Sequence, residues 1–111
     1  MRKTQKKIAR AAALKLAKRY IALCAGSGIA ISRAILFGSQ GAGAAKEHSD
    51  IDLLLVSDQF KNNTLENWKL IAPITARLYD VEPHPYPPAK FKKGDPFIEE
   101  VKRLGIEIKI R

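Results

Sequence analysis

The sequence predicts an α/β (α+β) fold, a small mixed sheet of three to four strands flanked by helices. Short apolar runs of strand length alternate with longer stretches in which apolar residues recur every three or four positions. Glycine or proline stands between most of these segments. The length of 111 residues suits one domain with a single core, and no apolar run is long enough to cross a bilayer.

The first half of the chain is predicted to form one helix and two strands. In residues 3–25, apolar side chains recur at three- and four-residue intervals, and the sequence AGSG ends the helix. The run RAILF at residues 33–37 is typical of a buried strand, and a loop rich in Gly and Ala follows it. The run DIDLLLV at residues 50–56 is a second strand, which its apolar residues hold in the core.

The next two elements are a helix and an edge strand. Residues 65–78 have helical spacing, in which Trp68 is expected to face the core. Pro73 should kink this helix or break it into two pieces. Residues 81–88 are expected to be extended, because four prolines exclude a helix there. Since so few backbone donors remain, this strand should lie at the edge of the sheet.

The chain is predicted to finish with a helix and a short strand. Lys92 and Lys93 are expected in a solvated basic turn. Asp95 is the expected N-cap of the last helix, with Pro96 at its first position. Gly105 ends this helix, and the isoleucines after it alternate as in a short terminal strand.

The positive charge is concentrated at the start of the chain. Of the 20 Lys and Arg residues, nine lie in residues 1–33, which contain no acid; 20 − 9 leaves 11 bases, against 11 acids in the rest. The first helix, rather than the whole fold, is therefore either a docking face for an acidic partner or nucleic acid, or a solvated surface. Cys24 has no partner within the chain, so we expect a buried free thiol and a cytoplasmic location.

Asp50 and Asp52 are the first candidate site residues. Residues two apart in a strand face the same side, roughly 6.6 Å apart at the backbone. Two divalent cations about 3.5–4 Å apart would neutralise such a pair, and hard oxygen ligands suit Mg²⁺. Alone, an Asp-x-Asp pair is more often a solvated strand face.

Gly38 and Ser39 are the second candidate element, directly after the RAILF strand. A glycine lets the backbone approach a phosphate closely, and a serine hydroxyl with exposed N–H groups can bind phosphate oxygens. By itself, a Gly-Ser pair after a strand is more often only a turn.

Together, the two elements form the string LFGSQGAGAAKEHSDIDLLLV at residues 36–56, which resembles the DNA polymerase beta-like nucleotidyltransferase superfamily. The characteristic motif of this superfamily is Gly-Ser followed, after a loop of fixed length, by Asp-x-Asp. The spacing, Ser49 and the apolar tail are similar to the minimal nucleotidyltransferase (MNT) branch. The resemblance implies one nucleotidyltransferase domain over residues 1–111, with a basic N-terminal helix in 1–30 and a catalytic core in 33–111.

The resemblance also implies roles for individual residues. Gly38 and Ser39 would hold the triphosphate, and Asp50 and Asp52 would hold one or two Mg²⁺ ions. Glu82 takes the place of the family's third carboxylate, as a metal ligand or as the base toward the acceptor hydroxyl.

Some positions depart from the family pattern or compete with these assignments. Glu82 stands where the family usually has Asp, and Ala42 stands where an Arg is common. Asp80 has the same strand parity as Glu82 and is an alternative to it. His84 shares that face and could approach the substrate, although a solvated edge histidine is the more frequent case. His48 is either a loop residue or a nucleotide contact.

The implied reaction transfers a nucleoside monophosphate, AMP from ATP, to a hydroxyl and releases pyrophosphate. In MNT relatives the known arrangement is a toxin–antitoxin pair, in which the MNT protein adenylylates a HEPN ribonuclease toxin. We therefore expect a HEPN-type partner protein. Two alternatives remain: a binding module that neutralises its partner by occlusion, and an aminoglycoside-type small-molecule transferase. A homo-oligomer stays open, and no membrane partner is expected.

Overall fold

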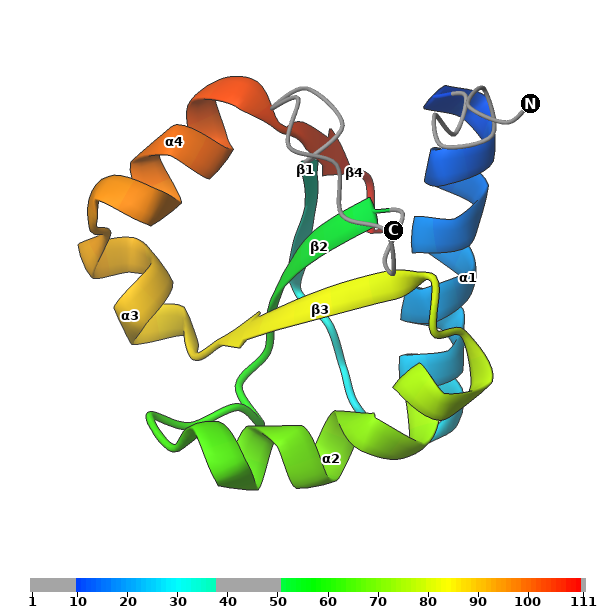
Figure 1. Ribbon diagram of the computed structural model, residues 1–111. Helices are drawn as coiled ribbons and strands as arrows, with labels where there is room; N and C mark the ends of the chain where they lie inside the picture. Colours follow the sequence, from blue (N-terminus) through cyan, green and yellow to red (C-terminus); the bar gives the residue numbers. More distant parts are fainter. Residues whose placement is uncertain (1–9, 38–50, 111) are drawn as a thin grey trace.

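A computed structural model describes residues 10–37 and 51–110 (Figure 1). The elements follow in the order α1 (Arg10–Gly26), β1 (Arg33–Phe37), β2 (Ile51–Val56), α2 (Thr64–Arg77), β3 (Val81–Tyr86), α3 (Pro88–Lys93), α4 (Pro96–Leu104) and β4 (Ile106–Ile108). They form a four-stranded mixed sheet with helices on both faces, which confirms the predicted fold class. Within these residues, no helix is both long enough and apolar enough to span a membrane.

The strand order across the sheet is β3-β2-β1-β4. β1 pairs antiparallel with both β2 and β4, whereas β3 pairs parallel with β2. β3 therefore lies at the edge of the sheet, as its prolines predict. The register aligns Phe37 of β1, Asp52 of β2 and Glu82 of β3 in one row across the sheet.

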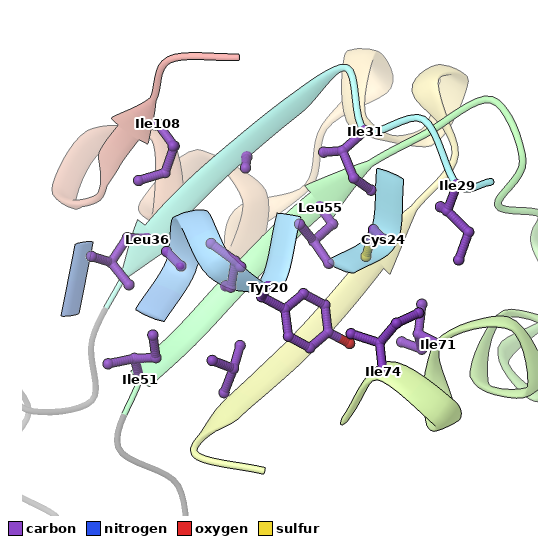
Figure 2. Close-up of a cluster of buried hydrophobic side chains, with 14 of the residues drawn as sticks. Tyr20, Cys24, Ile29, Ile31, Leu36, Ile51, Leu55, Ile71, Ile74 and Ile108 are labelled. Carbon is purple, nitrogen blue, oxygen red and sulfur yellow. The ribbon is translucent and has the colours of Figure 1, made fainter. Parts of the chain in front are cut away.

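α1 and α2 cover one face of the sheet and enclose the larger part of the core (Figure 2). Tyr20 of α1 is fully buried there, and its hydroxyl oxygen lies 2.8 Å from Thr75 Oγ1 of α2. Cys24 is buried beside it, as expected, and this burial raises the pKa of its thiol to about 11. α1 ends at a turn in which Gly28 has a φ of 87°, a value that favours glycine.

α3 and α4 cover the opposite face of the sheet (Figure 1). Their buried side chains pack against alternate residues of β1 and β2, and this smaller cluster consists of Ile35, Leu54, Val56, Phe91, Ile98 and Val101. The Asp95 carboxylate accepts a hydrogen bond from the Ile98 backbone N–H at 2.8 Å. Asp95 is thus the N-cap of α4, and Pro96 is at its first position, as predicted.

The prediction that Trp68 lies in the core is wrong. Its side chain is 46% exposed, because the buried positions of α2 are Asn67, Ile71 and Ile74. Asn67 fixes this rotation of the helix: its side-chain amide binds both the N–H and the carbonyl of Lys61, at 2.8 and 2.7 Å. Adjacent helical positions point about 100° apart, so Trp68 turns toward solvent.

Two further expectations concern Pro73 and the pair Lys92 and Lys93. Of the two outcomes predicted for Pro73, a kink or a break, the break is excluded, because α2 continues from Thr64 to Arg77. Pro73 is exposed, so the carbonyl that loses its backbone donor is open to water. Lys92 and Lys93 do not form a turn; they are exposed in the last turn of α3, which Pro88 begins at a position where a missing N–H costs nothing.

Candidate functional site

The candidate site lies on the face of the sheet that α3 and α4 cover. Leu54 and Val56 pack toward these helices, and alternation along β2 places Asp52 on the same face. On β3, Tyr86 packs against the same cluster, so Glu82 and His84 also share this face. Strand pairing therefore gathers acidic and imidazole side chains from two adjacent strands.

Asp52 is the most deeply buried of these groups, with 5% of its surface exposed. A carboxylate buried to this degree needs charged or hydrogen-bonding partners. One partner is His84, whose Nε2 lies 3.2 Å from Asp52 Oδ1. Glu82 is directly beside Asp52 in the parallel register, so a second carboxylate adjoins the first.

The three side chains form a group with the geometry of a metal site. Asp52, Glu82 and His84 each offer one ligand atom, and these atoms all lie within 4.8 Å of one another. Two neighbouring carboxylates repel each other, and a bound cation would remove that repulsion. The donor set therefore fits a divalent cation.

Aromatic rings form one wall of the site. The His84 ring lies 5.1 Å from the Phe37 ring and 5.9 Å from the Phe97 ring, measured between centroids. Phe97, at the start of α4, also contacts the rings of Phe37 and Tyr86, at 5.6 and 6.4 Å. Burial, with a smaller contribution from the Asp95 charge, raises the pKa of Tyr86, so its phenol stays protonated at neutral pH. The wall is thus apolar and uncharged beside the carboxylates.

The sequence-predicted site residues divide into two groups. Asp52 and Glu82 lie side by side, although their chemical roles stay predictions. Gly38, Ser39 and Asp50 lie outside the described residues, as do Ala42 and His48. Gly38 follows Phe37 directly in the sequence, and Phe37 is the residue opposite Asp52.

Asp80 does not join the group of ligand atoms. It lies in the turn between α2 and β3, where its backbone carbonyl accepts a hydrogen bond from the Ile51 N–H at 3.2 Å. Of the two carboxylates compared by parity, Glu82 is therefore the one whose side chain reaches Asp52 and His84.

The expectation that His84 is a solvated edge residue is wrong. Its side chain is 26% exposed and contacts Asp52, because α4 brings Phe97 over this part of the edge strand. The sequence contained one signal for this arrangement: His84 and Glu82 are two residues apart and share a face. The parallel register that brings His84 diagonally toward Asp52 could not be read from that signal alone.

Comparison with protein families gives one match. The model of the family described as "Nucleotidyltransferase domain" matches residues 22–108, which include Asp52, Glu82 and His84 as well as the Gly-Ser and Asp-x-Asp motifs. Comparisons with curated proteins and with solved structures gave no match. The match covers most of the chain and agrees with the mixed sheet and its acidic row, and the chain belongs to the nucleotidyltransferase domain family.

Proposed function

We propose that this protein transfers AMP from ATP to a hydroxyl group of a partner protein. The observation that carries the proposal is the juxtaposition of Asp52 and Glu82 on adjacent strands, in a chain of the nucleotidyltransferase domain family. Membership of the family supports nucleotidyl transfer in general. The donor, the acceptor and the metal are the proposed specifics.

One or two Mg²⁺ ions would be held by Asp50, Asp52 and Glu82. A divalent cation at such carboxylates neutralises negative charge on phosphate oxygens during displacement at phosphorus. The burial of Asp52 favours this use, because a partly dehydrated carboxylate attracts a cation more strongly than one in water.

The protein's own residues would orient the two reactants. Gly38 and Ser39 would bind the triphosphate oxygens at the end of β1, next to the row that contains Asp52. The acceptor oxygen forms a bond to the α-phosphorus while the bond from that phosphorus to pyrophosphate breaks. Glu82 either completes the metal site or takes the proton of the acceptor hydroxyl.

The proposed acceptor is a HEPN-type toxin, which the chain would silence as an MNT antitoxin. The MNT-like string at residues 36–56 supports this assignment. A surface feature supports a protein partner in general: Leu65 and Trp68 lie three residues apart on α2, and they are 61% and 46% exposed. Exposed apolar side chains that lie together can form part of a protein interaction surface, and Trp is enriched among the residues that contribute most to such surfaces.

The test uses ATP labelled at the α-phosphate, Mg²⁺ and the protein that co-purifies with this chain. Label is expected on the partner with wild-type protein and with the control Asp58→Asn, whose side chain is exposed outside the site. Asp52→Asn should abolish labelling. A parallel reaction contains an aminoglycoside in addition to the partner; label on the aminoglycoside and none on the partner would refute the protein acceptor.

A second candidate function is neutralisation of the partner by binding alone. Two departures from the family pattern favour this alternative. Ala42 leaves the loop without the Arg that would contact the phosphates, and the longer side chain of Glu82 shifts its carboxylate from the position that an Asp would give it. Inhibition of the partner without label, equally strong in wild-type protein and in Asp52→Asn, would establish this alternative.

A further inference from the structure

We infer that His84 is a metal ligand together with Asp52 and Glu82, and that this mixed site prefers a first-row transition-metal ion such as Mn²⁺ over Mg²⁺. The inference rests on the proposed use of this site for a divalent cation, but not on the nucleotide or the acceptor. The family resemblance implies only carboxylate ligands, and the inference adds the imidazole nitrogen of His84 to them.

The distances between donor atoms suit a shared ion. Ligands at about 2.1 Å from one cation, at right angles to each other, lie about 3 Å apart. His84 Nε2 and Asp52 Oδ1 are 3.2 Å apart, and the three ligand atoms lie within 4.8 Å of one another. A cation could therefore contact all three with only small side-chain movements.

The imidazole is held in place for this role. Its backbone lies in β3 opposite Leu54 of β2, and its ring packs against both Phe37 and Phe97, which also contact each other. This packing limits rotation of the ring and directs Nε2 toward Asp52. A metal at Nε2 would replace the direct contact between this nitrogen and Asp52 Oδ1, and the ring proton would then reside on Nδ1.

The nature of the donor decides the metal. Mg²⁺ prefers oxygen ligands and water, whereas imidazole nitrogen suits transition metals, whose affinities rise from Mn²⁺ toward Cu²⁺. Two carboxylates with one imidazole therefore bind Mn²⁺ more tightly than Mg²⁺. Removal of the imidazole should weaken Mn²⁺ binding much more than Mg²⁺ binding.

The test measures metal binding and electron spin echo modulation of bound Mn²⁺ on the full chain, in a nitrogen-free buffer without nucleotide. The variants are His84→Phe, which keeps an aromatic ring against Phe37 and Phe97, and His84→Gln. The control is His48→Gln, because His48 is the other histidine of the chain. Circular dichroism confirms that each variant is folded.

Wild-type protein and the His48→Gln variant are expected to show ¹⁴N modulation from a bound imidazole, and both His84 variants should lose it. Mn²⁺ affinity should fall in the His84 variants by at least the roughly 10- to 100-fold that loss of an outer-shell partner costs, while Mg²⁺ affinity should change much less. Modulation that persists without His84, or Mn²⁺ binding in the wild type without modulation, would overturn the inference. In both of these cases the proposed transfer reaction could still be observed. Absence of any divalent cation binding would overturn both the inference and the metal requirement of the proposed function.

Discussion

Alkaline pH tests the packing of α1 against α2, because two protonated groups are buried between these helices and the sheet. Burial raises the pKa of Tyr20 from 10.0 to about 12 and that of Cys24 from 9.0 to about 11. Well below pH 9 both groups are protonated in the folded and the unfolded chain, so their stabilising contribution is complete. Between pH 9 and 12 the unfolded chain ionises first, and the free energy of unfolding therefore falls as the pH rises.

The magnitude follows from the size of the pKa shift. Two pKa units correspond to about 2.7 kcal/mol, which is the upper limit for the loss of stability caused by ionisation of Tyr20. Tyr20→Phe removes this pH dependence and also the hydrogen bond to Thr75, which contributes about 0.5–1.5 kcal/mol at neutral pH. The variant should thus be less stable at pH 8 but lose less stability between pH 10 and 12.

Urea denaturation followed by circular dichroism, repeated from pH 8 to pH 12, measures both effects. Tyr79→Phe is the matched control, because Tyr79 is 74% exposed and should leave both the stability at pH 8 and its pH dependence unchanged. Parallel pH profiles for wild type and Tyr20→Phe between pH 10 and 12 would refute the reasoning.

Three further predictions concern α4 and its two ends, and thermal or urea denaturation measures each. Phe97→Ala removes the ring that packs on Phe37, His84 and Tyr86 and should cost about 1–3 kcal/mol; Leu104→Ala on the same helix, at a site 62% exposed, should cost under about 0.5 kcal/mol. Asp95→Ala should cost about 1 kcal/mol through loss of the N-cap, whereas Asp95→Asn should keep most of it. Gly105→Ala should cost about 1–3 kcal/mol, because the new Cβ would lie 2.7 Å from a backbone carbonyl oxygen. Equal losses in Phe97→Ala and Leu104→Ala, or no loss in either of the other two alanine variants, would contradict these assignments.

The strands could be predicted from the sequence because each has a simple local cause. After Arg33, the run 34–37 is apolar throughout, and it forms most of β1 between two other strands. Pro83 and Pro85 exclude a central position for their strand, and β3 is indeed at the edge. Local signals also located the capped start of α4, because Asp95 and Pro96 act within one helical turn.

Features that depend on contacts between distant segments could not be predicted in the same way. The rotation of α2 depends on Asn67 bonding to the backbone of Lys61, a contact that hydrophobic periodicity does not encode. Trp68 was misplaced for that reason. The contact between His84 and Asp52 joins residues 32 positions apart and depends on a parallel register and on the covering ring of Phe97. Parity alone showed only that Glu82 and His84 share a face.

Pro83 and Pro85 stand at alternate positions of β3, and this spacing affects both the exposed edge of the sheet and the site beside Asp52. The backbone carbonyls of Asp80 and Tyr86 accept hydrogen bonds from the N–H groups of Ile51 in β2 and of Ser57 directly after it, at 3.2 and 3.3 Å, so even-numbered residues direct their backbone groups toward the sheet. Odd-numbered residues direct theirs outward, and there Pro83 and Pro85 present no N–H to another strand.

The same period of two decides which side chains reach the site. Even-numbered side chains of β3, Glu82 and His84 among them, face α4, whereas the prolines lie on the opposite face of the sheet. Proline at positions 83 and 85 therefore removes N–H groups that point away from the sheet. It removes no hydrogen bond to β2 and no side chain of the site. A proline at position 82 or 84 would remove both at once, because these positions supply backbone pairing to β2 and the groups beside Asp52.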